Sequence, residues 1–354
     1  MPLSVLRISE KLEKYLSKIY LNYEHVNVSD LQSLAKGWET ELFSFKFTYE
    51  KERKKFEEQL ILRMYPGTNR KEKTEWEYKV LTALFNAGYP VPKTHIIELN
   101  EEVLEKPFII MDRIKGEDMG KLFLAAVEEN DQETILSIIK LLCKLFVKLH
   151  NIEWQALPLE IKDVGALNPY YFIDRKILVY GKMINQSEFH ELQPILDWLI
   201  ERKNDAYSKK ISVIHRDFHP HNIIVTEERE AFVVDWPSCS IGDYREDLGW
   251  SLLLTYAYTN KEIRDMILEY YEKEKGSKVE NIDYFEILAI LRRFSDIMNI
   301  FRFGTKKAGM REEAIKQIKE TTYHMKRILD LLKEKTGIKV PKLEEFILNL
   351  DAKS

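Results

Sequence analysis

The sequence predicts an α+β protein with two lobes: an N-terminal lobe built on an antiparallel sheet with one long helix, and a mostly helical C-terminal lobe. Its 354 residues exceed what one hydrophobic core usually organises, so two cores are expected. Apolar residues alternate as in strands before residue 112, whereas after it they recur at helical spacing. We therefore predict one lobe from residues 1–112 and a second from residues 113–354.

The N-terminal lobe is predicted to start with an amphipathic helix over residues 1–20 and to continue with strands. A strand buried on one face is indicated by the alternating aromatic residues Phe43, Phe45, Phe47 and Tyr49. Residues 60–65 are its predicted hairpin partner, and the charged residues 50–58 are predicted to form a solvated hairpin tip. A helix over residues 74–85 and strands over residues 91–98 and 108–112 complete the lobe.

The C-terminal lobe is predicted to contain a core helix over residues 136–150. Its apolar residues recur at helical spacing: Ile139, Leu142, Cys143, Phe146 and Leu149. Cys143 is then a small buried hydrophobe. His150 ends this helix, and we interpret it as a capping or surface residue.

Composition and charge exclude several classes of function. A net charge of −4 and a pI near 6.2 argue against a nucleic-acid partner, which would favour a basic surface. Two cysteines are too few for a disulfide-stapled secreted fold. The longest apolar stretches are too short to span a bilayer, and residues 1–20 lack the pattern of a signal peptide. We therefore expect a cytoplasmic protein with no membrane partner.

The most informative segment combines three polar residues with two short apolar runs. Asp217 is followed by Asn222 five residues later and by Asp235 thirteen residues after that. Residues 223–225 and 232–234 predict a hairpin around the polar turn 226–230, which would carry Asn222 and Asp235 to the same end. Phosphoryl transfer from a nucleotide needs a carboxylate near the acceptor hydroxyl and two oxygen ligands for Mg²⁺. Asp217 is the candidate for the first task, and Asn222 and Asp235 are the candidates for the second.

Two histidines flank Asp217 in this loop. His215 and His219 have no His or Cys partners at the intervals of a zinc site, so we do not predict a metal role for them. Asp217 itself is a weak base, since an ordinary Asp has a pKa of about 3.9. We expect it to orient the acceptor hydroxyl and to collect the proton late in the reaction.

Residues 215–250 resemble the aminoglycoside phosphotransferase and choline kinase family, whose signature runs H-G-D-x-H-x-x-N, then I-D-W, then G-D-P-x-x-D-L-A. The matching residues are His215, Asp217, His219, Asn222, Asp235, Trp236, Gly242, Asp243, Asp247 and Leu248. The chain departs from the signature at Arg216, where the family usually has Gly and protein kinases have Arg, and at Pro237 and Tyr244. The resemblance implies a protein-kinase-like fold and Mg²⁺-dependent transfer of the γ-phosphoryl group of ATP or GTP to a small-molecule hydroxyl.

The resemblance also implies roles in the catalytic loop. In the family the first His supports the loop through hydrogen bonds and the second helps to fix the active-site turn, which are the roles implied for His215 and His219. Asp247 could cap the predicted helix over residues 248–258, and the family's equivalent Asp braces the catalytic loop. We favour a structural role for both Asp243 and Asp247.

Nucleotide contacts are implied for the N-terminal lobe. Arg63 stands where the family has a Lys or Arg that touches the nucleotide phosphates, and Glu77, with Glu75 as the alternative, is the candidate carboxylate that holds it. Gly37 lies where the family has its phosphate-covering loop. Residues 107–116 resemble the hinge whose backbone pairs with adenine, which makes its residues Met111, Asp112 and Ile114 candidates for nucleotide binding.

The acceptor stays open at this level. Its pocket is expected to come from residues 169–193 and from C-terminal helices around Tyr256, Tyr270, Tyr284, Arg292, Arg293 and Phe294. No acidic cluster there is distinctive enough to prove a polycationic aminoglycoside, so a sugar, an amino alcohol, a nucleoside or a macrolide also fits. A protein kinase is disfavoured because Asp235 and Asp247 lie too close in sequence for an activation segment. A silent nucleotide-binding scaffold is disfavoured by the complete catalytic set, and either a monomer or a homodimer is compatible with the sequence.

Overall fold

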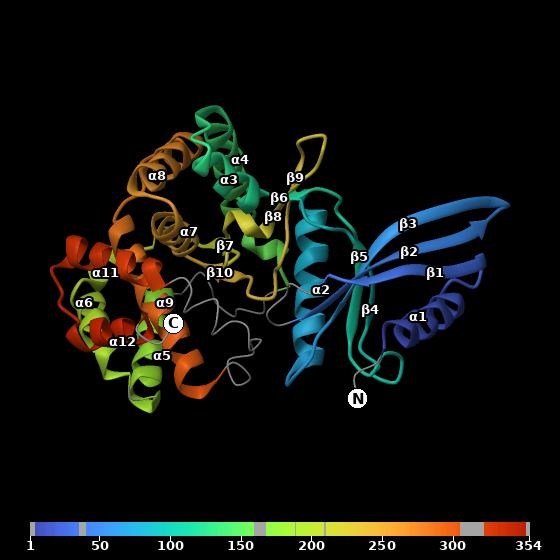
Figure 1. Ribbon diagram of the computed structural model, residues 1–354, viewed down its shortest axis with the longest axis horizontal. Helices are drawn as coiled ribbons and strands as arrows, with labels where there is room; N and C mark the ends of the chain where they lie inside the picture. Colours follow the sequence, from blue (N-terminus) through green and yellow to red (C-terminus); the bar gives the residue numbers. More distant parts are fainter. Residues whose placement is uncertain are drawn as a thin grey trace. The chain divides into compact units, whose positions relative to one another are not determined.

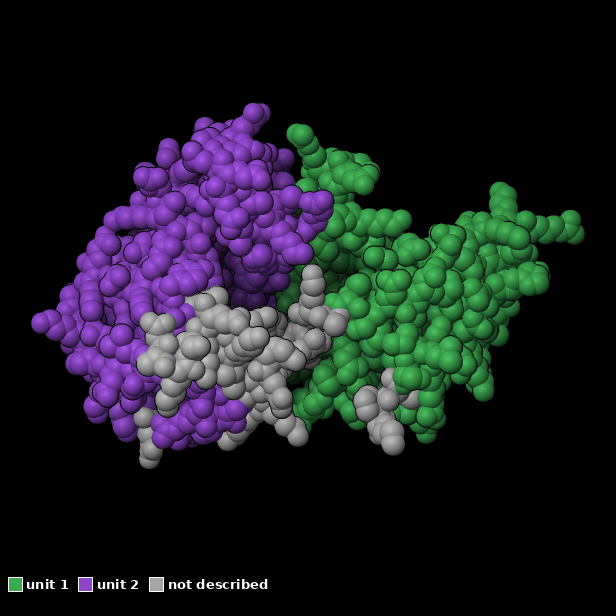
Figure 2. Space-filling model, viewed as in Figure 1, with its two compact units in different colours: residues 1–116, 224–237 green, residues 117–223, 238–354 purple. Residues whose placement is uncertain are grey.

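The computed structural model describes residues 4–34, 40–158, 168–187, 189–208, 210–304 and 322–351. The chain divides into two compact units, which Figure 2 shows in different colours, and Figure 1 labels the helices and strands. Unit 1 comprises residues 1–116 and 224–237, and unit 2 comprises residues 117–223 and 238–354. Unit 1 holds an antiparallel sheet and unit 2 is mostly helical, so the predicted α+β fold class is confirmed. The predicted boundary between residues 112 and 113 stays a prediction.

Unit 1 contains two long helices and a five-stranded sheet. The helices are α1 (Val5–Ile19) and α2 (Arg70–Asn86), and the strands are β1 (Glu24–Ser33), β2 (Glu41–Lys51), β3 (Lys54–Met64), β4 (Thr94–Glu98) and β5 (Phe108–Asp112). The strand order is β1-β2-β3-β5-β4, and all neighbours are antiparallel. Strands β8 (Ile223–Val225) and β9 (Ala231–Val233) form the hairpin predicted around residues 226–230.

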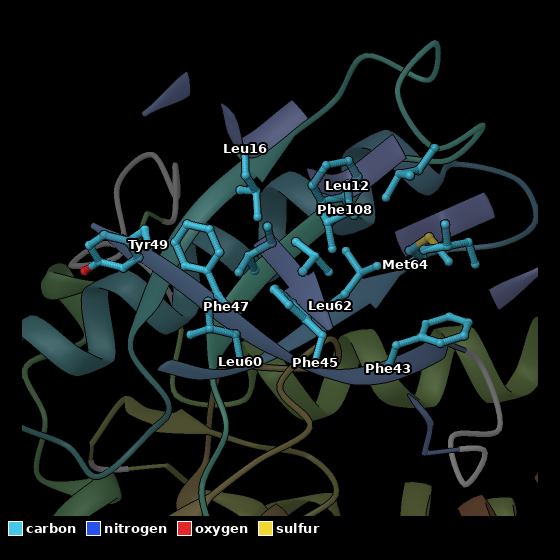
Figure 3. Packing of buried hydrophobic residues seen from close by; sticks show 14 residues of the cluster. Leu12, Leu16, Phe43, Phe45, Phe47, Tyr49, Leu60, Leu62, Met64 and Phe108 are labelled. Carbon is cyan, nitrogen blue, oxygen red and sulfur yellow. The ribbon is translucent and has the colours of Figure 1, made fainter. Parts of the chain in front are cut away.

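The core of unit 1 lies between α1 and one face of the sheet (Figure 3). The predicted aromatic alternation on β2 is confirmed, because all four aromatic side chains are buried in this cluster. On β3, Leu60, Leu62 and Met64 point into the same core, so the residues between them point to the opposite face. The face that carries Arg63 is thereby fixed by the packing of its neighbours.

Three predictions for unit 1 need correction at the level of individual elements. Strand β1 was not predicted, because Val28 is its one buried residue and the strand shows little apolar alternation. The charged residues 50–58 are mostly strand, because the tight turn takes only Glu52 and Arg53, both with positive φ. Helix α2 begins four residues before its predicted start, since its first turn is charged and exposed and has no apolar periodicity to detect.

Unit 2 consists of helices around a short antiparallel pair of strands. The helices are α3 (Met119–Glu128), α4 (Gln132–His150), α5 (Tyr171–Ser187), α6 (Gln193–Glu201), α7 (Tyr244–Tyr258), α8 (Lys261–Lys275), α9 (Ile282–Phe303), α11 (Thr322–Thr336) and α12 (Pro341–Asp351). Short 3-10 turns are η1 (Trp154–Ala156), η3 (His190–Leu192), η4 (Lys203–Ala206) and η5 (Pro220–Asn222), and the strands are β6 (Glu117–Asp118), β7 (Ser212–Ile214) and β10 (Ser240–Gly242). Strands β7 and β10 pair with each other and thereby flank the loop that carries Asp217.

Two predictions for unit 2 were wrong. His150 is not a surface or capping residue: it is buried, with Nδ1 3.0 Å from the Tyr271 hydroxyl and Nε2 3.5 Å from Asp247 Oδ2. Asp247 is not the cap of α7, because that helix begins at Tyr244 and Asp243 caps it by accepting a hydrogen bond from the Arg245 N–H. Among the described helices, none combines the length and the apolar character needed to cross a bilayer.

Candidate active site

Unit 1 pairs the predicted phosphate-binding cation with a buried carboxylate. Arg63 projects from β3 on the face away from the core, and Nε lies 2.9 Å from Glu77 Oε2 on α2. Both side chains are almost fully buried, and Arg63 Nε also donates to the Tyr65 hydroxyl at 3.1 Å. Glu75, the alternative partner, forms an ion pair with Lys79 instead. The ion pair confirms the prediction that Glu77, and not Glu75, is the partner of Arg63.

Burial raises the pKa of Glu77 to about 7, and the Asp235 charge adds to the increase. Arg63 and the Trp236 N–H, which donates to Glu77 Oε1 at 3.2 Å, both oppose that increase in pKa. Glu77 therefore ties three separate segments of unit 1 together: β3, α2 and the segment after β9. The charge state of this carboxyl depends on Arg63 staying beside it.

Asp235 follows β9 in unit 1 and adopts a left-handed backbone with φ of 70°. Arg63 Nη2 donates to its Oδ1 at 2.7 Å, while the side chain keeps 46% of its surface exposed. Asp is among the few residues that tolerate this conformation, because its short polar side chain can bond locally. One carboxylate oxygen of Asp235 is thus held by Arg63, and the exposed side chain is accessible to a further ligand.

The remaining nucleotide candidates of unit 1 are placed as follows. Met111 is buried in β5, where it pairs with Ile61 of β3. Asp112 ends β5: its N–H donates to the Lys93 carbonyl at 2.9 Å, and its carboxylate lies 2.6 Å from His95 Nε2. Ile114 follows two residues later and is half-buried. Gly37 lies outside the described residues.

The four loop candidates are gathered in unit 2 between β7 and β8. Asn222 Nδ2 donates to the Asp217 carbonyl at 2.9 Å and lies 3.4 Å from the Asp217 carboxylate. His219 Nε2 lies 3.5 Å from that carboxylate. His215 is fully buried, and its Nδ1 accepts a hydrogen bond from the Asp217 N–H at 3.3 Å. This contact matches the supporting role that the resemblance implies for His215.

The carboxylate of Asp217 is held in its charged form. Burial alone would raise its pKa, but His219, Arg292 and His215 outweigh that effect and hold the pKa well below its usual range. Trp250 on α7 adds a hydrogen bond from its indole Nε1 to Asp217 Oδ1 at 2.9 Å. Asp217 is therefore an oriented, ionised hydrogen-bond acceptor. Sequence reasoning missed Trp250, because a single Trp in an apolar helix is usually a core residue.

Two buried contacts fix the backbone next to Asp217. Asp247 accepts hydrogen bonds from the N–H groups of His215 and Arg216, both at 2.6 Å. The Arg292 guanidinium donates to the Arg216 carbonyl and stacks on Trp250, with its centre 3.9 Å from the ring. Arg216 itself has a φ of 69°, a conformation that favours glycine, which is the residue that the family usually has here. The loop is therefore held on both sides by α7 and α9.

The oxygen donors fit the metal that the resemblance implies. Mg²⁺ prefers carboxylate and carbonyl oxygens. The Asn222 amide nitrogen is directed at Asp217, so its carbonyl oxygen is left for a ligand, and Asp235 keeps its second carboxylate oxygen. Among the described residues, the one carboxylate and histidine cluster with metal-ligand spacing is Glu24, His25 and Glu50, and it includes none of these candidates.

Comparison with known proteins assigns the chain to a family. A model described as the phosphotransferase enzyme family matches residues 30–283, which is more than half of the chain. The chain belongs to the phosphotransferase enzyme family. The resemblance drawn from residues 215–250 is thereby confirmed, and the match extends from β1 in unit 1 to the start of α9 in unit 2.

Curated relatives of this phosphotransferase family member match it over part of their length. Acyl-CoA dehydrogenase family member 11 of Pongo abelii is 28% identical over 177 residues, which are 49% of this chain and 22% of that protein. The Homo sapiens protein of the same name is 26% identical with the same coverage. Family member 10 of Mus musculus is 25% identical over 206 residues, 56% of this chain and 18% of that protein. The chain thus spans about a fifth of the length of these relatives.

Solved structures of phosphotransferases share the fold. Aminoglycoside phosphotransferase APH(4)-Ia, in a ternary complex with ADP and hygromycin B, has a TM-score of 0.59 and 16% identity, covering 93% of this chain and 100% of that chain. Ethanolamine kinase of Plasmodium vivax has a TM-score of 0.56 and 14% identity, covering 90% and 85%. Macrolide 2'-phosphotransferase MphH from Brachybacterium faecium has a TM-score of 0.55 and 13% identity, covering 86% and 97%. At these identities the likeness shows the fold alone.

Proposed function

We propose that the protein transfers the γ-phosphoryl group of ATP or GTP to a hydroxyl of a small molecule in a Mg²⁺-dependent reaction. The observation that carries the proposal is the state of Asp217: a carboxylate held ionised, oriented by Trp250 and Asn222, and fixed on a braced loop. Family membership supports the reaction class. The ADP and hygromycin B named with APH(4)-Ia support a nucleotide donor and a small acceptor.

The roles that we propose follow from the contacts. Asp217 orients the acceptor hydroxyl and receives its proton as the new bond between hydroxyl oxygen and γ-phosphorus forms. The bond between the γ-phosphorus and the bridging oxygen breaks, and the nucleoside diphosphate leaves. Arg63, held by Glu77, would contact the nucleotide phosphates. Asn222 and Asp235 would hold Mg²⁺, which when bound neutralises charge on the transferring phosphates.

The remaining candidates have supporting roles. His215 and His219 position Asp217, and the backbone at Met111, Asp112 and Ile114 would receive the nucleotide base. A side chain that is positioned to accept or donate a proton in the transition state accelerates a reaction by about 10²- to 10⁴-fold. Removing the Asp217 carboxylate is therefore expected to lower turnover by that order while leaving nucleotide affinity in place.

The test separates the two aspartates. With Mg²⁺ and ATP or GTP, a panel of hydroxylated metabolites and antibiotics is screened for diphosphate release, and product is checked by phosphorus NMR. Asp217→Ala is expected to lose turnover but to bind Mg²⁺·AMP-PNP as the parent protein does, whereas Asp235→Ala loses the Mg²⁺-dependent binding. Asp197→Ala, at an exposed position of α6, removes the same charge away from the loop and should change neither quantity.

The outcomes separate the alternatives as well. Equal loss of nucleotide affinity in Asp217→Ala and Asp235→Ala would contradict the assigned roles. Phosphoryl transfer to polypeptides but to no small molecule would make the protein a protein kinase. Intact nucleotide binding without turnover of any acceptor would make it a binding scaffold.

A further inference from the structure

A small, partly open pocket lies next to Asp217 within unit 2. Lys176 and Tyr180 of α5, Arg216 of the catalytic loop, Glu246 and Trp250 of α7 and Arg292 of α9 line it together with an apolar stretch of α9. The sequence-based expectation had named Arg292 and the region of α5 for the acceptor. Tyr284 and Phe294, from the same expectation, are buried core residues.

Two lining residues join the pocket to the proposed reaction centre. Trp250 donates to the Asp217 carboxylate, and Arg216 is the residue directly before Asp217. Arg292 bridges both by stacking on the Trp250 ring and binding the Arg216 carbonyl. A molecule bound in this pocket therefore reaches the side chain that we propose to orient the acceptor hydroxyl.

The charge of the lining is predominantly positive. Three cations, Lys176, Arg216 and Arg292, face one carboxylate, Glu246, which is paired with Lys176 at 2.7 Å. The count over the lining residues is thus three positive charges minus one negative charge, or +2.

The two arginines differ in how far their charge is compensated. Arg292 Nε lies 3.7 Å from Asp296 Oδ2, and the Asp296 side chain is 48% exposed, so water screens the negative charge that it supplies. Within the described part of the chain, no carboxylate lies within ion-pair distance of the Arg216 guanidinium, which interacts with the Asp296 charge only at longer range. A polycationic acceptor would meet like charge in this pocket, whereas a carboxylate or phosphate would meet the positive charge of Arg292 and the Arg216 guanidinium, which is suited to bind it through paired hydrogen bonds.

We propose that this pocket binds an anionic group of the acceptor, so that the substrate is a small hydroxylated anion bearing a carboxylate or a phosphate ester. The inference rests on the proposed function and deepens it by naming the class of acceptor. Lys176 and Glu246 are the pair that borders the anion, while Arg216 and Arg292 contact it. Trp250 and Tyr180 supply a flat apolar wall with a hydroxyl donor.

The first experiment measures binding without nucleotide, so that it does not depend on catalysis. Calorimetric titrations at constant ionic strength compare 3-hydroxybutyrate and glycerol 3-phosphate with the uncharged 1,3-butanediol and glycerol and with the cation choline. At least one anion is expected to bind tenfold or more tightly than its uncharged counterpart and than choline, and the two anions distinguish a carboxylate site from a phosphate site. Equal binding of charged and uncharged compounds would overturn the inference.

Variants locate the anion. Arg216→Gly removes the guanidinium from a backbone position that favours glycine, so the fold is expected to persist while anion affinity falls tenfold or more. Lys176→Met is expected to weaken anion binding less, because Glu246 already pairs with that ammonium. The matched control is Arg175→Gln, the exposed neighbour on α5 that does not line the pocket. An equal loss of anion affinity in Arg175→Gln and Arg216→Gly would show that only the net charge of the protein matters, and it would overturn the inference.

Two further measurements separate the inference from the proposed function. Saturating Mg²⁺·AMP-PNP should leave the anion affinity unchanged or raise it. If the nucleotide instead displaced the anion completely, the cations of the pocket would belong to the nucleotide site, and the inference would be overturned. Diphosphate release driven as well by choline or glycerol as by the anions would also overturn it, while the phosphotransferase assignment would stand. Anion binding with no acceptor-dependent release in any assay would instead overturn the proposed function.

Discussion

Replacing Arg63 with methionine would leave the Glu77 carboxyl buried without the cation beside it. In the parent protein Glu77 has a pKa of about 7 because burial raises it and Arg63 limits the increase. A group whose folded pKa is raised contributes stability below its unfolded pKa and loses it as pH rises through the folded pKa. The parent protein therefore loses stability from this group between pH 4.5 and about 7, and no more above that range.

Arg63→Met extends that loss to higher pH, because the pKa of Glu77 rises further once the Arg63 charge is gone. Above pH 7 the gap in unfolding free energy between parent and variant should widen by about 1.4 kcal/mol per pH unit, until the new pKa is reached. Below pH 5 the carboxyl is protonated in both proteins, and the Glu77 contribution to the gap disappears. Other lost contacts of Arg63 add an offset that does not depend on this titration.

Hydrogen exchange of the β3 and β5 amides reports the opening of unit 1 and measures this gap from pH 5 to pH 9. The control is the double variant Arg63→Met/Glu77→Gln, which has no titrating group at position 77. The difference in unfolding free energy between this double variant and Arg63→Met should grow from pH 5 to pH 9. A gap between Arg63→Met and the parent protein that stays constant from pH 5 to pH 9 would refute the argument that Glu77 depends on Arg63 for its charge.

Three further changes probe unit 2. Asp247→Asn replaces one of the two carboxylate oxygens that accept backbone N–H groups with an amide nitrogen that cannot accept, and it should lower stability by about 3 kcal/mol in denaturant unfolding; a loss under 1 kcal/mol would contradict this. Trp250→Phe removes the hydrogen bond to Asp217 and should lower kcat about tenfold; unchanged kcat would show that the bond is not used. Gly120→Ala would place a Cβ against the His221 ring and should cost about 1 to 3 kcal/mol; adding His221→Ala should recover that stability, and a double variant as unstable as Gly120→Ala would contradict the assigned clash.

The sequence predicted the elements whose burial repeats along the chain. Strand β2 was found because its aromatic residues alternate over the whole strand and all of them enter the core. The loop with Asp217 and Asn222 was found because oxygen-bearing residues at fixed spacing between two apolar runs are rare in other contexts. Both signals are local. Each is visible in the sequence because the residues that carry it are close together along the chain.

The features that escaped prediction depend on contacts between distant segments. His150 looked like a helix end, and only the packing of α8 and α7 buries it against Tyr271 and Asp247. Trp250 resembled any core tryptophan, and only the placement of the loop gives its N–H the Asp217 carboxylate as a partner. Strand β1 lies at the edge of its sheet with Val28 as its one buried residue, so it left almost no hydrophobic signal. The cellular location and the oligomeric state stay predictions.

Arg216 links the local geometry to the choice of acceptor. A non-glycine residue in the left-handed region costs about 1 to 2 kcal/mol, and the family's usual glycine would avoid that cost at φ of 69°. The Arg216 backbone does not need the side chain, because its N–H binds Asp247 and its carbonyl binds Arg292, contacts that glycine could make equally. The guanidinium instead lines the pocket beside Asp217. The consequence of having Arg216 in place of glycine is therefore a positive charge that a ligand can contact. This charge lies one residue from Asp217, the carboxylate that we propose to receive the proton.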